Sequence, residues 1–263
     1  MFNKKSTSHV STARPTDHLF LTQDEQHIKR NLERWRGENL PKGIYMAHTI
    51  TIERRNAGPL FTRPAQAVFS TWDVLSTSLV DTNKIKKAQD VMNKGLKKRE
   101  TGLFFEIALI LDVPCQNIIG TFSHDVWFPN HIGRQNSSPT GKVLDSAALF
   151  ESIRTGETKK NAIKPDGSPF PRMAGGFNQI KTPQEILNRT DISRHNEILV
   201  VGRPGINIYK GLPATKEITL YGIVIIPKRL PGDIDNDRAF HQKWLAISDK
   251  LKALNPGVNC IFY

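Results

Sequence analysis

Phe69-Ser70-Thr71-Trp72-Asp73-Val74-Leu75-Ser76-Thr77-Ser78-Leu79-Val80 is the stretch around which this chain is organised. An apolar pair leads into the triplet Ser76-Thr77-Ser78, and a lysine-rich segment with helical spacing and a long apolar run follow it. This order predicts a strand that ends in small hydroxyl side chains, then a helix, then a buried strand. Serine and threonine hydroxyls can bind backbone or neighbouring side chains. We therefore interpret the triplet as part of the floor of a cleft.

Length, charge and cysteine content limit the class of protein. The chain has 263 residues, with 37 Lys and Arg against 25 Asp and Glu, a formal net charge of +12. This excess favours an acidic partner such as a nucleic acid, a membrane surface, an acidic protein or a phosphate-bearing ligand, although a merely solvated basic surface is the alternative. Cys115 and Cys260 are too few for a disulfide framework or a zinc site. No apolar run approaches the roughly 20 residues of a membrane span.

Residues 1–20 are predicted to be a disordered leader, and residues 21–263 a single domain. The segment Met1 to His18 is rich in Ser, Thr and Lys and has no apolar core, so it is not a Sec signal peptide. Such a leader would suit the unfolded secretion signal of a system that injects proteins into a host cell.

Hydrophobic spacing predicts alternating helices and strands within the domain. The boxes Thr22/Glu25 and Thr182/Glu185 each mark the start of a helix. The remaining elements are helices at 82–99, 143–154 and 235–254, and strands at 43–55, 103–113, 197–201, 205–209 and 218–226. Residues 124–194 form a long insertion between strands, and long structured loops are usually functional. We predict that this insertion serves recognition of a protein target.

Three features follow one another along the chain. A strand ends near Arg54, the triplet Ser76-Thr77-Ser78 comes second, and His195-Asn196-Glu197 opens the strand that leads to the turn 202–205. From Ile44 to Pro227, this order resembles the ADP-ribosyltransferase toxins of the arginine, Ser-Thr-Ser, Gln-or-Glu-x-Glu type, the cholera-toxin-like branch. The resemblance implies an α+β fold in which two packed mixed β-sheets, surrounded by helices, form a cleft for NAD.

The resemblance also implies a role for each residue of the site. Glu197 would stabilise the oxocarbenium-like state formed when the nicotinamide–ribose bond breaks, and Arg54 would hold the pyrophosphate of NAD. Ser76 would orient both, with Thr77 and Ser78 lining the NAD site. The strands of Arg54 and Ser76 are expected to be neighbours, with Glu197 facing them. Each residue also has a purely structural interpretation, and Arg55 or His48 are alternatives to Arg54.

His195 departs from the pattern of the family, which has Gln or Glu at that position. The family associates Glu with arginine acceptors, whereas an imidazole can accept a proton from a hydroxyl. His195 therefore argues against arginine as the acceptor and leaves a serine or threonine of a host protein open. Ubiquitin is one candidate because some injected effectors of this broad class modify its threonine. The resemblance implies a bacterial effector delivered into the host cytosol.

Two other classes of function compete with this hypothesis. A basic nucleic-acid-binding protein agrees with the charge, but no zinc site or aromatic–basic strand pattern supports it, so nucleic acid is not the expected partner. A non-catalytic module that binds a host protein through the same fold is the second. His124, Asp125 and His131 lack a further ligand at metal-site spacing, so no metal is expected.

Overall fold

The computed structural model describes residues 25–50, 55–82, 106–122, 180–189, 196–209, 211–227 and 237–262. The strands are β1 (Ile44–Ile50), β2 (Leu75–Asp81), β3 (Ile107–Asp112), β4 (Ile118–Phe122), β5 (Glu197–Val200), β6 (Thr219–Ile225) and β7 (Asn259–Phe262). The α-helices are α1 (Glu25–Glu33), α2 (Ala65–Phe69), α6 (Pro183–Arg189) and α7 (Asp237–Leu254). Short 3-10 helices lie at Gly37–Asn39, Arg55–Phe61 and Cys115–Asn117.

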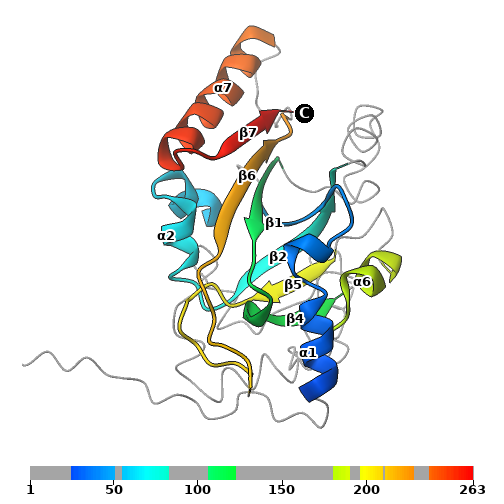
Figure 1. Cartoon of the computed structure of the whole chain (residues 1–263). Helices are drawn as coiled ribbons and strands as arrows, with labels where there is room; N and C mark the ends of the chain where they lie inside the picture. The colour runs from blue at the N-terminus through cyan, green and yellow to red at the C-terminus, as the bar shows by residue number, and fades with distance from the viewer. Residues whose placement is uncertain are drawn as a thin grey trace, which may run out of the picture.

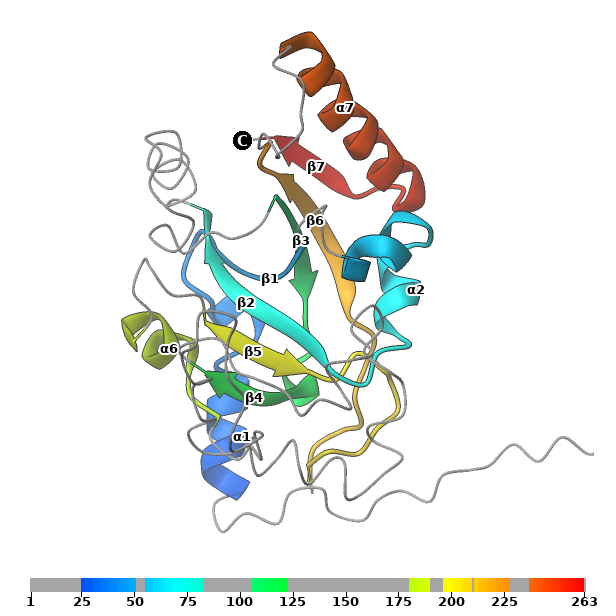
Figure 2. The same cartoon turned by 180° about the vertical axis from the view of Figure 1, so that it is seen from behind.

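The seven described strands form one mixed sheet in the order β4-β5-β2-β1-β3-β6-β7. Neighbouring strands are antiparallel except β6 and β7, which are parallel. Figures 1 and 2 show how strongly the sheet twists between the β6 end and the β4 end. The α+β class is thus confirmed, whereas the described strands lie in a single sheet where two packed sheets were expected.

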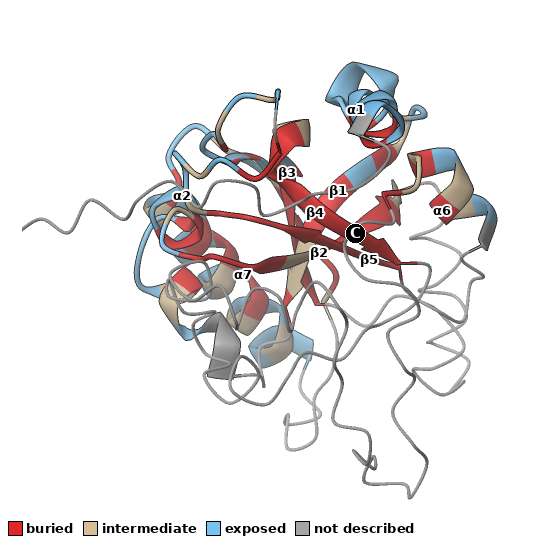
Figure 3. Cartoon of the chain, turned by 90° about the horizontal axis from the view of Figure 1, so that it is seen from below, coloured by how far each residue is buried: buried red, intermediate tan, exposed pale blue. Residues whose placement is uncertain are grey.

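Strand β3 has the composition of a strand that is covered on both faces. Its residues from Ile107 to Leu111 are all buried, as the continuous apolar run predicts. Along β1, β2 and β3, one face of the sheet carries the larger core, which includes Met46, Leu79 and Leu109. The other face carries a smaller cluster that includes Ala47, Val80 and Ile110. Figure 3 shows the buried strands at the centre and exposed helix surfaces outside them.

The predicted helices within the described residues are confirmed. In α1, Ile28 and Leu32 are buried together with the following Trp35, the face that the spacing predicts. At the start of α6, Thr182 N donates to Glu185 Oε2 at 2.8 Å, and Glu185 N donates to Thr182 Oγ1 at 3.3 Å, which is the predicted capping box. Helix α7 spans Asp237–Leu254, as predicted for 235–254.

Two expectations about strands are corrected by the structure, and one strand was missed. Ser76-Thr77-Ser78 lies in the first half of β2 rather than at the end of a strand, because the chain enters β2 directly after the turn that follows α2. Residues 205–209 are not a strand: Thr215 binds the backbone of Gly205 and Ile206 and keeps this segment in a loop of its own. The C-terminal strand β7 was not expected at all.

Other expectations lie outside the described residues. They concern the leader 1–20, Arg54, most of the helix expected at 82–99, the helix at 143–154, His195, and the insertion 124–194 apart from residues 180–189. Arg55 begins a 3-10 helix, and its side chain also lies outside the described set.

Candidate active site

Ser76 and Glu197 come from neighbouring strands. Strand β2 pairs with β1 on one side and with β5 on the other (Figure 2). In the register of β2 and β5, Ser76 lies opposite Leu199. Glu197 is two residues before Leu199, so it points to the same face of the sheet as Ser76. Diagonal neighbours of this kind lie roughly 7–8 Å apart, and their Cβ atoms are somewhat closer. This separation is well within the length of a dinucleotide.

Glu197 occupies a position that strands rarely give to a carboxylate. It pairs with Phe122 of β4, and its residue exposure is 2%. Continuing the register of β2 and β5 by one residue brings Ser78 opposite Glu197. Because burial of a charged group is costly, buried carboxylates usually have a specific structural or functional reason.

The three hydroxyls of the triplet have different environments. Thr77 Oγ1 donates to Ile198 O at 2.7 Å, and Ser78 Oγ donates to Asn196 O at 2.8 Å. These two hydroxyls therefore tie β2 to the backbone at the start of β5. Ser76 is half-buried, and among the described residues its Oγ has no hydrogen-bond partner. Ser76 is thus the member of the triplet whose hydroxyl is available to a ligand.

Asn196 continues the ladder between β2 and β5 with its side chain. Leu79 N donates to Asn196 Oδ1 at 2.6 Å, and Asn196 Nδ2 donates to Leu79 O at 3.1 Å. The side-chain amide of Asn196 thereby makes the two hydrogen bonds that a further backbone residue of β5 would make with Leu79. Asn196 is 3% exposed, so these bonds are shielded from water. They fix the backbone position from which Glu197 projects.

A second attachment joins the opposite end of the same two strands. Trp72 O accepts hydrogen bonds from Gly202 N at 2.9 Å and from Arg203 N at 2.8 Å. Beside them, Arg203 Nε lies 2.9 Å from Asp73 Oδ1, an ion pair whose carboxylate side chain is fully buried. The backbones approach so closely that a Cβ on Gly202 would lie 2.2 Å from Phe69 O. The turn at 202–205 was predicted, but this close approach was not.

His48 lies on the other face of the sheet from Ser76 and Glu197. It is registered with Leu109 of the larger core, and its ring makes edge contacts with Phe69 and Trp72 at centroid distances of 5.7 and 5.6 Å. Its Nδ1 donates to Ser76 O at 2.8 Å, so the proton resides on Nδ1. His48 therefore supports the backbone of the triplet from behind, which argues against it as the group that holds a dinucleotide.

The environment of His48 favours the neutral imidazole. Burial lowers the pKa of His48 from its ordinary value of 6.5, and the hydrogen bond to Ser76 opposes this shift only in part. Although the residue as a whole is half-buried, Nε2 is inaccessible and has no hydrogen-bond partner among the described residues. A protonated ring would have to bury a charge there, which is unfavourable.

Sequence reasoning missed the residues that support the site from outside the motif. Asn196 was read only as the middle of His195-Asn196-Glu197, although an amide beside a strand end is a recognisable substitute for a backbone pair. Asp73 lies between the apolar residues Trp72 and Val74. A carboxylate that is buried with such neighbours needs a cationic or hydrogen-bonding partner. Nothing in the sequence pairs it with Arg203.

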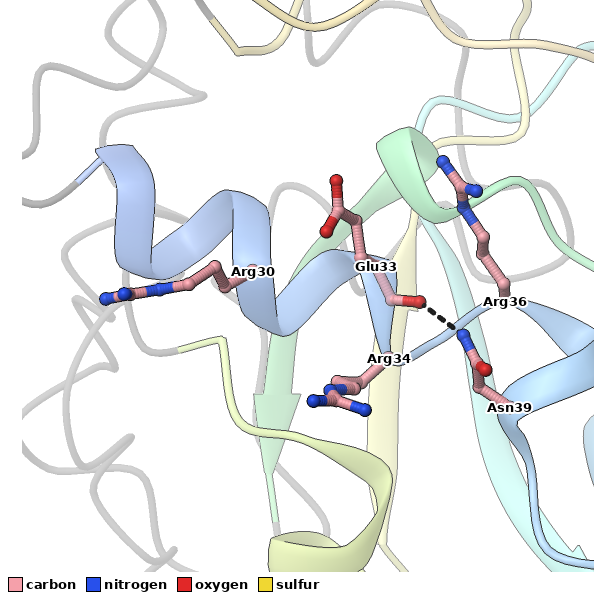
Figure 4. A pocket seen from close by; sticks show the side chains of 5 residues that line it. All are labelled: Arg30, Glu33, Arg34, Arg36 and Asn39. Atoms are coloured by element: carbon pink, nitrogen blue, oxygen red, sulfur yellow. Dashed lines mark hydrogen bonds between the residues drawn. The ribbon is translucent and has the colours of Figure 1, made fainter.

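Charged groups elsewhere in the described residues do not form a metal centre. No group of three or more His, Cys, Asp or Glu side chains in this part of the chain could hold a metal ion. None of the described helices combines the length and apolar character needed to cross a bilayer. A solvent-open depression does lie at the end of α1, lined by Arg30, Glu33, Arg34, Arg36 and Asn39 (Figure 4).

Comparisons of the chain with protein families, with curated proteins and with solved structures found no match.

Proposed function

We propose that this protein is an NAD-dependent mono-ADP-ribosyltransferase that modifies a side chain of a host protein in the host cytosol. The observation that carries the proposal is the pair Ser76 and Glu197: neighbouring strands present an available hydroxyl and a buried carboxylate on the same face of the sheet. The order of Arg54, the triplet and Glu197 along the chain adds to it.

The proposed reaction breaks the bond between nicotinamide and C1′ of the ribose, and nicotinamide leaves with the bonding electrons. Positive charge develops on the ribose, and the carboxylate of Glu197 stabilises it. Arg54 binds the pyrophosphate by charge-assisted hydrogen bonds. The acceptor hydroxyl forms the new bond to C1′, and His195 accepts the proton that it releases. The Ser76 hydroxyl orients the ribose and Glu197.

The decisive experiment compares Glu197→Gln with the wild-type protein. The amide keeps the size and most of the hydrogen bonding but removes the charge, so the loss appears in kcat. We expect NAD binding by calorimetry to be nearly normal and nicotinamide release to fall by roughly 10²-fold or more. Glu217→Gln is the matched control, because Glu217 is exposed and bonds only Gln66 among the described residues.

Two further variants test the other assigned roles. Arg54→Ala should mainly weaken NAD binding, and a parallel Arg55→Ala variant shows which arginine is responsible. His195→Ala should reduce transfer to protein more than hydrolysis of NAD, because the imidazole is assigned to the proton of the acceptor hydroxyl. If Glu197→Gln transfers ADP-ribose at close to the wild-type rate, the enzyme hypothesis is wrong, and a non-catalytic or nucleic-acid-binding function takes its place.

A further inference from the structure

Three arginines surround the depression at the end of α1. Arg30 lies in the last turn of the helix, whereas Arg34 and Arg36 lie beyond its last residue. All three are exposed, as are the two other residues that line the depression, Glu33 and Asn39. We call this set of five residues the α1 arginine surface.

The backbone that carries these arginines is held firmly. Trp35, between Arg34 and Arg36, is 1% exposed, and its Nε1 donates to Lys181 O at 2.6 Å. Asn31 Nδ2 donates to Ile180 O at 2.7 Å, and Asn39 Nδ2 donates to Glu33 O at 2.9 Å. The backbone of the α1 arginine surface is therefore preorganised, so a partner has only the side chains to order on binding.

Stabilisation of the helix accounts for only part of this arrangement. A cation in the last turn, such as Arg30, interacts favourably with the helix dipole. Arg34 and Arg36 follow the helix, and the exposed charges of residues 29–42 comprise five basic and two acidic side chains. Buried contacts account for the position of Trp35 but not for arginines on both sides of it.

The directions of the side chains indicate the shape of the partner. Figure 4 shows Arg30 and Arg34 extending on one side of the end of α1, and Arg36 with Glu33 on the other. A single phosphate would require the guanidinium groups to converge on one point, and they do not. Arginines spread over a firm surface instead match several carboxylates that are themselves spread along a chain.

We propose that the α1 arginine surface is a docking site for an acidic segment of a protein partner. Figures 1 and 2 place α1 beside the β4–β5 end of the sheet, the half of the molecule that carries Glu197. If this partner is also the acceptor of ADP-ribose, that identity rests on the proposed function. The docking of an acidic segment does not depend on the proposed function.

The test uses fluorescein-labelled decaglutamate as the probe, with anisotropy measured on the full chain at about 50 mM salt, where screening is weak. The variant is Arg34→Gln/Arg36→Gln. The matched control is Lys250→Gln/Lys252→Gln, which removes the same charge from exposed positions of α7. Thermal melting of both variants verifies folding, and NAD hydrolysis is recorded in parallel.

We expect the arginine variant to bind decaglutamate about five- to tenfold more weakly, and the α7 control to stay within about twofold of wild type. NAD hydrolysis should be equal in all three proteins. Equal weakening in both variants, or none in the arginine variant, overturns the proposal. It is also overturned if decauridylate RNA binds more tightly than decaglutamate and loses that binding with the same arginines. Failure of the enzyme hypothesis would appear separately, as absent NAD turnover in a wild-type protein that still binds decaglutamate.

Discussion

Replacement of Asn196 by alanine should destabilise the protein far more than a typical polar-to-alanine substitution. The change removes two buried hydrogen bonds, at 2.6 and 3.1 Å, and leaves both Leu79 N and Leu79 O without the partner they have on the β5 side. An unsatisfied buried group costs about 1–3 kcal/mol. Partial entry of water reduces the total, so we expect a loss of about 3 kcal/mol in the free energy of unfolding.

Equilibrium unfolding in urea measures this loss, with Asn188→Ala as the matched control. Asn188 is exposed on α6, and within the described part of the chain its Oδ1 accepts only from Gln184, so its replacement should cost less than about 0.5 kcal/mol. NAD turnover of folded Asn196→Ala should also fall, because Glu197 loses its adjacent anchor. A difference between the two variants of less than about 1 kcal/mol, within the uncertainty of extrapolated stabilities, would refute the assignment of Asn196 as an extension of the ladder.

Two other substitutions test the remaining supports of the site. Gly202→Ala should cost about 3 kcal/mol or more, because the new Cβ would lie 2.2 Å from Phe69 O, whereas Gly58→Ala, with nothing within 4 Å, should be nearly neutral in the same urea titration. His48 has a folded-state pKa below its unfolded value, so its contribution to stability is complete above about pH 6.5 and is lost as the pH falls toward the folded pKa. Unfolding free energies between about pH 7.5 and 5 should decline more steeply for wild type than for His48→Gln, by up to about 1.4 kcal/mol per pH unit; parallel curves would contradict this prediction.

Local signals were sufficient wherever one element determined its own structure. The Thr182/Glu185 box starts α6 because both of its hydrogen bonds are formed within four residues. The stripe of α7 is confirmed because Trp244 and Leu251 recur at helical spacing and are buried. The apolar run before Val113 forms the central strand β3. A strand with apolar side chains on both faces is stable when both faces are covered.

Contacts between distant segments were beyond the reach of the sequence. The position of the start of β2 depends on the close approach of Gly202 to Trp72. It also depends on the ion pair between Asp73 and Arg203, which are 130 residues apart in the sequence. Strand β7 pairs in parallel with β6 only after α7 has returned the chain to the sheet, and its four residues carry too weak a pattern to identify. His48 fits an alternating strand in either orientation until the core around Phe69 is known.

The polar groups between β2 and β5 explain why this pair of strands keeps one register. A slip of one residue would turn Ser76 and Glu197 to opposite faces of the sheet, while apolar residues on both sides of β5 would still be buried. Hydrophobic burial alone therefore discriminates poorly between the two registers. The hydrogen bonds from Thr77 Oγ1 to Ile198 O and from Ser78 Oγ to Asn196 O can form only in the observed register. The same holds for the two hydrogen bonds between Asn196 and Leu79. Two residues of the triplet thus secure the register that brings the third to the same face as Glu197.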